Sequence, residues 1–185
     1  MKPADCILFS GGAAGAEAEF GACAERHGID EVNYTFEGHQ PVRRRGLRAL
    51  NHEELQAGDV SLDYVSRLMN RRYAEGVTIR KVLQTLWYQV NSGQEIFVIG
   101  TILPDRTVRG GTGWGAEFAK LCNKPLFVFD QERDRWFAWK GEAWTPCPAG
   151  EPVVRHTHFT GTGTRHLADN GKAAIAALFD RSFGG

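Results

Sequence analysis

The sequence predicts an α/β fold, a Rossmann-like doubly wound sheet that is mostly parallel and carries a late β-hairpin. Short apolar runs alternate with amphipathic segments of helix length along most of the chain, the order expected for parallel strands joined by helices. The run at residues 95–101 is apolar almost throughout, as in a strand that is covered on both faces. Residues 135–144 alternate around Lys140-Gly141, which is typical of a hairpin.

The first half of the chain contains two predicted strands and three predicted helices. Strands are expected at 6–10 and 31–36, because both runs are rich in apolar, β-branched or aromatic residues. A helix is predicted between them, ending at Gly28. Residues 37–51 contain Pro and Gly without a periodic pattern and are expected to form a loop. Helical spacing returns after Asp59, a candidate N-cap, and predicts helices over the residues 60–73 and 78–91.

The second half continues the same alternation. The strand at 95–101 is followed by a predicted helix over 113–122, a strand over 125–130 and the hairpin, and an amphipathic helix over 172–183 closes the chain. A strand is also expected before the glycine-rich stretch that begins at Phe159. Because no stretch has the composition of an interdomain linker, we expect a single domain over residues 1–185.

Composition excludes several classes of function. The 22 basic and 22 acidic residues give a formal net charge of zero, which argues against nucleic acid or an anionic membrane as partner. Apolar runs fall short of the roughly 18 residues of a spanning helix, and the first residues lack a secretory pattern, so a cytoplasmic protein is expected. No cofactor is expected, and no metal either, because His156 and His158 have no evident third ligand.

Glycine-rich loops follow three of the predicted strands, at Ser10–Glu17, Arg109–Glu117 and Phe159–Arg165. If these strands are parallel, the loops share one rim, where glycine backbone and helix N-termini suit a phosphate. The ordinary alternative is that the glycines serve only tight turns. The candidate ligand-binding residues are Ser10, Gly11, Gly12, Gly15, Glu17, Gly110, Gly111, Thr112, Gly113, Trp114, Gly161, Thr162, Gly163, Thr164 and Arg165 in the loops, with Gly100, Thr101, Asp130 and Gln131 at strand ends.

The second loop, "GGTGWGAE", resembles the G-G-x-G-T-x-x-E motif of the LOG phosphoribohydrolases, which belong to the SLOG superfamily of Rossmann-like nucleotide-binding proteins. Gly110, Gly111, Gly113 and Glu117 match it, whereas Trp114 stands at the threonine position. The family's catalytic arginine-lysine pair is absent from the corresponding segment, "TLWYQVNSGQ". Uncharacterised SLOG-like proteins are similar over nearly the whole chain, through "GGAAGAE", "WYQV", "IGT", "GGTGWG", "KPLFVFDQ" and "GTRH" in this order.

This resemblance implies the fold, a small nucleotide-type ligand and a homodimer formed through the apolar helix "LQTLWYQV". Two functions stay open. The protein could bind a nucleoside 5′-phosphate or an ADP-ribose-type ligand as a sensor, carrier or sequestering protein. Alternatively, it could hydrolyse an N-glycosidic bond, with Glu117 as the carboxylate that stabilises positive charge on the sugar and orients water. Glu117 could also be an exposed glutamate favoured by the helix dipole. Arginines at 43–48 are candidates for a lid over the phosphate.

Overall fold

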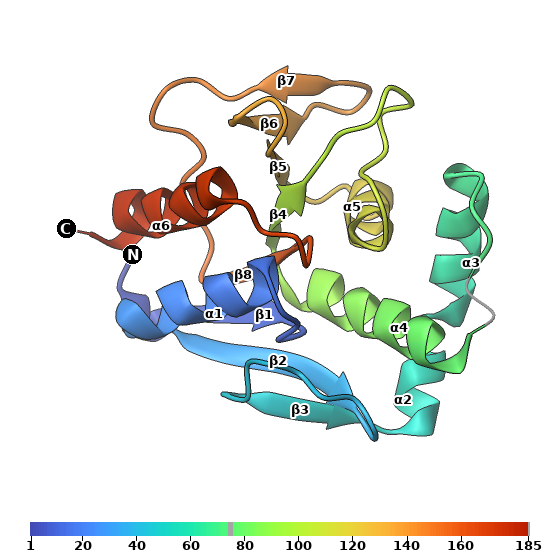
Figure 1. Ribbon diagram of the computed structural model, residues 1–185. Coiled ribbons are helices and arrows are strands. Elements are labelled where there is room, and N and C mark those ends of the chain that lie inside the picture. The colour runs from blue at the N-terminus through green and yellow to red at the C-terminus, as the bar shows by residue number, and fades with distance from the viewer. Residues whose placement is uncertain (74–75, 185) are drawn as a thin grey trace.

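A computed structural model describes residues 1–73 and 76–184, and it is built around one eight-stranded sheet with the order β3-β2-β1-β8-β4-β5-β6-β7. The strands from β3 through β5 are parallel, and β6 and β7 follow as an antiparallel hairpin (Figure 1). This confirms the predicted fold class. The strands are β1 (Ile7–Ser10), β2 (Asp30–Phe36), β3 (Leu47–Leu50), β4 (Glu95–Gly100), β5 (Leu126–Asp130), β6 (Arg135–Trp139), β7 (Trp144–Pro146) and β8 (His158–Gly163).

Helices cover both faces of the sheet. One face packs against α1 and α6, and the other against α2, α3, α4 and α5 (Figure 1). The arrangement is that of a three-layer α/β protein. The helices are α1 (Ala16–Arg26), α2 (His52–Gln56), α3 (Asp59–Leu68), α4 (Val77–Ser92), α5 (Thr112–Leu121) and α6 (Asp169–Phe183), preceded by a short 3-10 turn at Pro3–Asp5.

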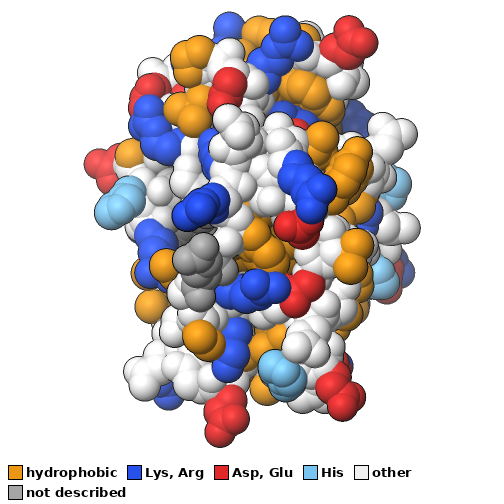
Figure 2. All heavy atoms as spheres, turned by 90° about the vertical axis from the view of Figure 1, so that its right-hand side faces the viewer, with side chains coloured by type: hydrophobic (Ala, Val, Ile, Leu, Met, Phe, Trp, Pro, Cys, Tyr) orange, Lys and Arg blue, Asp and Glu red, His pale blue; other side chains and the backbone are white. Residues whose placement is uncertain are grey.

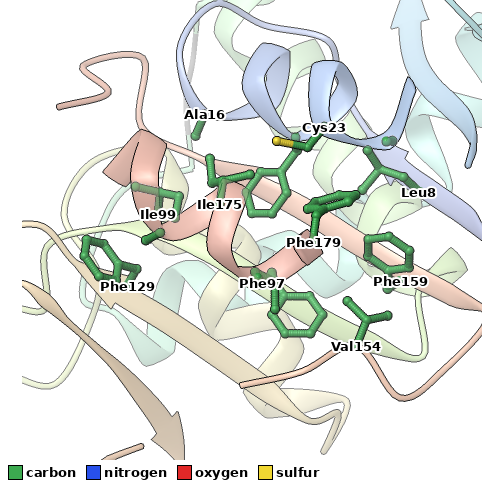
Figure 3. Close-up of a cluster of buried hydrophobic side chains, with 14 of the residues drawn as sticks. Leu8, Ala16, Cys23, Phe97, Ile99, Phe129, Val154, Phe159, Ile175 and Phe179 are labelled. Carbon is green, nitrogen blue, oxygen red and sulfur yellow. The ribbon is translucent and has the colours of Figure 1, made fainter. Parts of the chain in front are cut away.

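The continuous apolar run of β4 is explained by its burial on both sides. Phe97 and Ile99 belong to the core beneath α1 and α6, whereas Ile96 and Val98 belong to the core beneath α4 and α5. Figure 3 shows the first of these cores, in which Phe97 lies among side chains of the neighbouring elements. Each fully buried side chain of this size contributes roughly 1.5–3 kcal/mol to stability.

β8 is the last strand in sequence, but it lies in the middle of the sheet between β1 and β4. Gly161 makes this position possible, since a Cβ there would lie 2.5 Å from Phe20 Cγ of α1. The Ser10 hydroxyl donates a hydrogen bond to Gly161 O across the β1–β8 pair, at 2.8 Å. The insertion brings the carboxyl ends of β1, β8 and β4 next to one another.

The structure corrects the sequence prediction between the residues 37 and 73. The expected loop contains β3, which pairs in parallel with β2 at the edge of the sheet. Asn51 and Glu54 then form a capping box at the start of α2, a helix too short to show a periodic pattern. Gly58 rather than Asp59 is the N-cap of α3, and this helix ends at Leu68 instead of continuing to Tyr73.

The helix expected to form a dimer interface uses its apolar side chains within the fold. Leu86 and Val90 of α4 are buried against the sheet and α5. Large exposed apolar side chains occur on α3, where Val60, Tyr64 and Leu68 are each at least half exposed, and in the first turn of α4, at Val77 and Ile79. Figure 2 shows basic, acidic and hydrophobic side chains mixed over one face of the molecule. None of the helices in the described part of the chain is long and apolar enough to cross a membrane.

Candidate ligand-binding site

The carboxyl ends of β1, β8, β4 and β5 meet at a cavity of about 660 Å³. The chain leaves β1 toward one edge of the sheet and β4 toward the other, and doubly wound sheets bind their ligands at this kind of reversal. The structure thus brings the glycine-rich loops to one rim, as their parallel strands require. The predicted site residues that line the cavity are Gly11, Glu17, Gly100, Thr101, Gly110, Gly111, Thr112, Gln131, Thr162, Gly163, Thr164 and Arg165.

Glu17, in the first turn of α1, is a buried carboxyl group at this cavity. Its Oε1 accepts a hydrogen bond from the Thr162 hydroxyl at 2.8 Å, and its Oε2 accepts one from Ala13 N at 2.9 Å. Burial raises the pKa of Glu17 above its usual value, although these donors and the Arg165 charge act in the opposite direction. A carboxyl in this position can accept further hydrogen bonds from a ligand.

Gln89 of α4 is a second buried polar group at the cavity and is only 1% exposed. Its Oε1 has no hydrogen-bond partner within residues 1–73 and 76–184. A buried acceptor without a partner costs about 1–3 kcal/mol. Gln89 therefore destabilises the fold unless a ligand or water donates a hydrogen bond to its Oε1. The Gln89 amide lies beside Glu17, since a Cβ built on Gly11 would be 2.6 Å from Gln89 Nε2 and 2.8 Å from Glu17 Oε2.

The same helix also gives the cavity an apolar wall. Val82, Leu83 and Leu86 line it, together with the hydroxyl-bearing Thr85. Leu83 and Leu86 are buried, and α4 packs against β1, β2 and β8. Apolar walls with a few polar groups at fixed positions are typical of pockets for small organic ligands.

Two classes of glycine occur in the loops at the rim. Most are required by packing: a Cβ at Gly15 would lie 2.5 Å from Arg165 O, and one at Gly163, where φ is 155°, would lie 2.5 Å from Ile99 O. For these glycines, the fold itself explains the absence of a side chain.

Gly110 and Gly111 differ from these, because a Cβ at either position would have nothing within 4 Å. Gly110 has a φ of 69°, which is itself a backbone reason for glycine, whereas Gly111 has an ordinary helical backbone, with φ −61° and ψ −34°. They precede α5, and the first hydrogen bonds of this turn run from Gly113 N and Trp114 N. The N–H groups just before them lie at a helix N-terminus that borders the cavity, which is a favourable place for an anion.

Arg71 holds this loop in place from the side of α3. Its guanidinium donates to Val108 O and Gly110 O at 3.1 and 3.2 Å, and to the Thr107 hydroxyl at 2.8 Å. The residues before α5 are therefore anchored by side-chain hydrogen bonds, which favours a preformed site.

Charged side chains surround the mouth of the cavity. Arg109 and Glu132 form an ion pair of 2.7 Å, and both side chains are 60% exposed. Arg165 is exposed at the same rim, next to His39. Burial, followed by the Arg165 charge, lowers the pKa of His39. The mouth thus offers positive charge to an anion, while the polar groups on the cavity floor are buried.

Glu117 does not line the cavity. Its Oε2 pairs with Lys120 Nζ at 3.0 Å, and both side chains are largely buried. Lys120 in turn lies over the Trp139 ring of the hairpin, with Nζ 4.0 Å from the ring centroid. The reason is the helical phase: Glu117 is one turn into α5, on the side that faces β6 and β7. The carboxyl group at the cavity is Glu17.

Other candidate residues have partners within the fold. Trp114 is buried and packs on Tyr73 with ring centroids 5.6 Å apart, and it does not line the cavity. Asp130 is fully buried at the end of β5, where it accepts from Ile102 N and pairs with Arg133. The candidates that lie outside the cavity lining are Ser10, Gly12, Gly15, Gly113, Trp114, Glu117, Asp130 and Gly161.

The arginines predicted to close over a phosphate have structural partners instead. Arg43 and Arg45 both pair with Glu31, which is buried on β2, and Arg48 pairs with Glu54 at 2.6 Å. None of them lines the cavity. Arg43, Arg45 and Arg48 are thus held by carboxylates of the fold and away from the cavity at which a lid over a phosphate is expected.

Sequence reasoning missed Gln89 as a site residue. Val82, Leu86 and Gln89 follow the i, i+4, i+7 spacing of the buried face of α4. A polar residue at such a position is a signal that could have singled it out. The sequence gives no comparable signal for His39. This residue lies in a loop without a periodic pattern, and only the tertiary structure brings it to the cavity.

Within the described residues, no group of three His, Cys, Asp or Glu side chains is arranged to hold a metal ion. A second and more open hollow of about 760 Å³ lies against α3. Its charged side chains are largely paired with one another, as in Arg80 with Asp59 at 3.0 Å and Arg67 with Asp63 at 2.9 Å.

Comparisons with known proteins place the chain by its fold. No protein-family model matches it, and no curated protein matches its sequence. A crystal structure from Syntrophus aciditrophicus, titled "Putative molybdenum carrier protein", aligns with 98% of this chain and 96% of its own, with a TM-score of 0.57 and 15% identity. At this level of identity the similarity concerns the fold, and the chain therefore shares its architecture with a solved protein of that name.

Proposed function

We propose that this protein binds a small nucleotide-type ligand, a nucleoside 5′-phosphate or an ADP-ribose relative, in the cavity at the carboxyl ends of its central strands. It acts as a sensor, carrier or sequestering protein. The observation that carries the proposal is Gly111, which stands at a helix N-terminus beside the cavity and has neither a packing reason nor a backbone reason to be glycine. Its missing side chain leaves the backbone N–H groups of this turn open to a phosphate.

Three further features support this proposal. The cavity has an apolar wall and a polar floor, as expected for a ligand with a ring and a charged group. Arg165 adds positive charge at the mouth, where Arg109 is paired with Glu132. The sequence resemblance to SLOG proteins points to the same class of ligand. The solved neighbour is named as a molybdenum carrier, and a carrier role fits a site that holds a ligand without changing it.

The hydrolase alternative has less support. It requires a free carboxylate at the sugar, whereas Glu117 is paired with Lys120 outside the cavity. Glu17 does lie at the cavity, but its two oxygens already accept hydrogen bonds from Thr162 and Ala13, and burial raises its pKa. A buried, hydrogen-bonded carboxyl is better suited to recognising a ligand than to stabilising a developing cation.

A thermal-shift panel on the purified protein tests the proposal. The ligands are nucleoside 5′-monophosphates, ADP-ribose, inorganic phosphate and molybdate, and each mixture is analysed afterwards by chromatography. A ligand at 100 times its Kd adds about 2.7 kcal/mol to the free energy of unfolding, which corresponds to a shift of several degrees. We expect nucleotides to stabilise the protein and to be recovered intact.

The matched variants are Gly111→Val and Gly76→Val. Both positions are helix N-caps with room for a side chain, but only Gly111 borders the cavity. The nucleotide shift should disappear in Gly111→Val and persist in Gly76→Val. Stabilisation by molybdate alone would show that the ligand is a simple oxyanion. Release of free base would establish a hydrolase. Equal nucleotide shifts in both variants would show that the binding site does not include the loop at Gly111.

A further inference from the structure

The polar floor of the cavity carries hydrogen-bonding groups that a phosphate alone would not use. Glu17 and Gln89 are 7% and 1% exposed, and both line the cavity. The Glu17 oxygens have protein donors, whereas Gln89 Oε1 has no partner in the described part of the chain. Since buried polar groups are almost always hydrogen-bonded in folded proteins, an unsatisfied amide oxygen on a residue that lines the cavity points to a donor on the ligand.

The two side chains form one recognition surface. A single point next to Gly11 lies 2.6 Å from Gln89 Nε2 and 2.8 Å from Glu17 Oε2, so the carboxamide and the carboxyl group are adjacent. A carboxamide offers one donating and one accepting edge, whichever way its amide is turned, and a carboxylate offers only acceptors. If one oxygen of the carboxylate is counted with the carboxamide, the pair presents two acceptors and one donor to a ligand.

The complementary ligand edge has two N–H donors and one acceptor. This is the pattern of guanine, which carries a ring N–H and an exocyclic amino group beside a carbonyl; adenine has no ring N–H on its pairing edge. A flat ring also suits the rest of the pocket, where apolar side chains of α4, among them Leu83 and Leu86, line one wall.

We infer that the cavity floor selects a guanine-type base, with Gln89 and Glu17 as the residues that read its hydrogen-bonding edge. This inference rests on the proposed function, because it assigns the base end of the same ligand whose phosphate lies near Gly110 and Gly111. It adds a ligand class that the glycine-rich loops cannot specify, since backbone N–H groups contact a phosphate in the same way in every nucleotide.

Isothermal titration calorimetry with GMP, AMP and ribose 5-phosphate tests the inference. The variants are Gln89→Leu and, as a matched control, Gln84→Leu, which changes another buried glutamine of α4 that binds Asp59 rather than the cavity. We expect GMP to bind the unmodified protein about tenfold more tightly than AMP does. Gln89→Leu should abolish this preference and leave ribose 5-phosphate affinity within about twofold, while Gln84→Leu keeps the preference for GMP.

Glu17→Gln supplies a second test, since it keeps the shape of the side chain and does not depend on Gln89→Leu folding well. It should also weaken GMP binding more than ribose 5-phosphate binding. Equal affinities for GMP and AMP, or a GMP preference that survives both variants, would overturn the base assignment while leaving the cavity proposal intact. If none of the three ligands binds the unmodified protein, the proposed function fails as well.

Discussion

The Thr162 hydroxyl donates a hydrogen bond to Glu17 Oε1 over 2.8 Å and thereby joins β8 to the first turn of α1 beneath the cavity. Ala13 N donates to the other oxygen of the same carboxyl group. The Glu17 side chain is thus fixed by two elements before a ligand arrives. A site whose polar groups are held in this way loses little conformational entropy on binding.

Replacing Glu17 by Gln should change how stability depends on pH. Burial raises the pKa of Glu17 in the folded protein, so the folded state binds this proton more tightly than the unfolded state does. The stabilisation is complete below the unfolded pKa, which lies near the ordinary glutamate value of 4.5, and it is lost as the pH rises through the folded pKa. We therefore expect the unmodified protein to lose stability relative to Glu17→Gln as the pH rises, in urea unfolding at several pH values.

A constant difference in stability between the unmodified protein and Glu17→Gln from about pH 4 to pH 8 would contradict this prediction. It would mean that Glu17 titrates with the same pKa in the folded and unfolded states. Circular dichroism of both proteins at each pH serves as the control, because it separates a titration effect from a change in fold.

Gly111→Ala and Gly163→Ala should separate a glycine that serves the ligand from one that serves the fold. Alanine at 111 has a helical backbone and open space, so the free energy of unfolding should stay within about 0.5 kcal/mol of its original value. Alanine at 163 has a φ of 155° and would lie 2.5 Å from Ile99 O, so it should cost about 2 kcal/mol or more.

Gly111→Ala should weaken ligand binding even though it leaves the free energy of unfolding nearly unchanged. Gly111→Ala is expected to weaken nucleotide binding about fivefold, the loss of roughly one hydrogen bond, as measured by calorimetry on the folded variant. Unchanged affinity in this variant, together with intact stability, would show that the loop before α5 does not hold the anion.

Glu117→Gln should leave ligand binding unchanged within about twofold, because this side chain pairs with Lys120 beside the hairpin and not at the cavity. Because both side chains of this ion pair are largely buried, leaving Lys120 without its partner should cost about 3 kcal/mol in the free energy of unfolding. Denaturant unfolding and nucleotide titration of the same sample measure both effects. A large loss of affinity in the folded variant would return Glu117 to the site.

Glu132→Gln should strengthen the binding of anionic ligands at low salt. Glu132 pairs with Arg109 at the cavity mouth, and its removal leaves the guanidinium free for a phosphate. We expect affinity to rise about threefold at low ionic strength and the gain to vanish at about 1 M salt, where charges on exposed groups are screened within roughly 3 Å. A gain independent of salt would argue against an electrostatic origin.

The sequence predicted the parallel sheet well because its strands are buried on both faces, as the run around Phe97 illustrates. It did not predict where β8 lies. The chain order places this strand last, and its central position depends on Gly161 leaving room for Phe20. A contact between residues so far apart in the chain leaves no periodic pattern that could be read beforehand.

The candidate site was predicted in part for similar reasons. Loops after parallel strands had to meet at one rim, so twelve of the residues named in advance line the cavity. Glu117 was assigned by motif spacing, but the phase of α5 turns it toward Lys120. Gln89 is not among the predicted site residues because the apolar neighbours on its helix suggest a core face, and only the tertiary structure places the middle of α4 at the cavity.

The most direct test of the account is a two-dimensional ¹H-¹⁵N NMR titration with a nucleoside 5′-monophosphate such as GMP. The account predicts that the backbone amides of Gly110, Gly111 and Thr112 and the side-chain amide of Gln89 shift together, while the amides around Glu117 and the hollow beside α3 do not. Shifts confined to that hollow, or no shifts at saturating ligand, would contradict the cavity as the nucleotide-binding site.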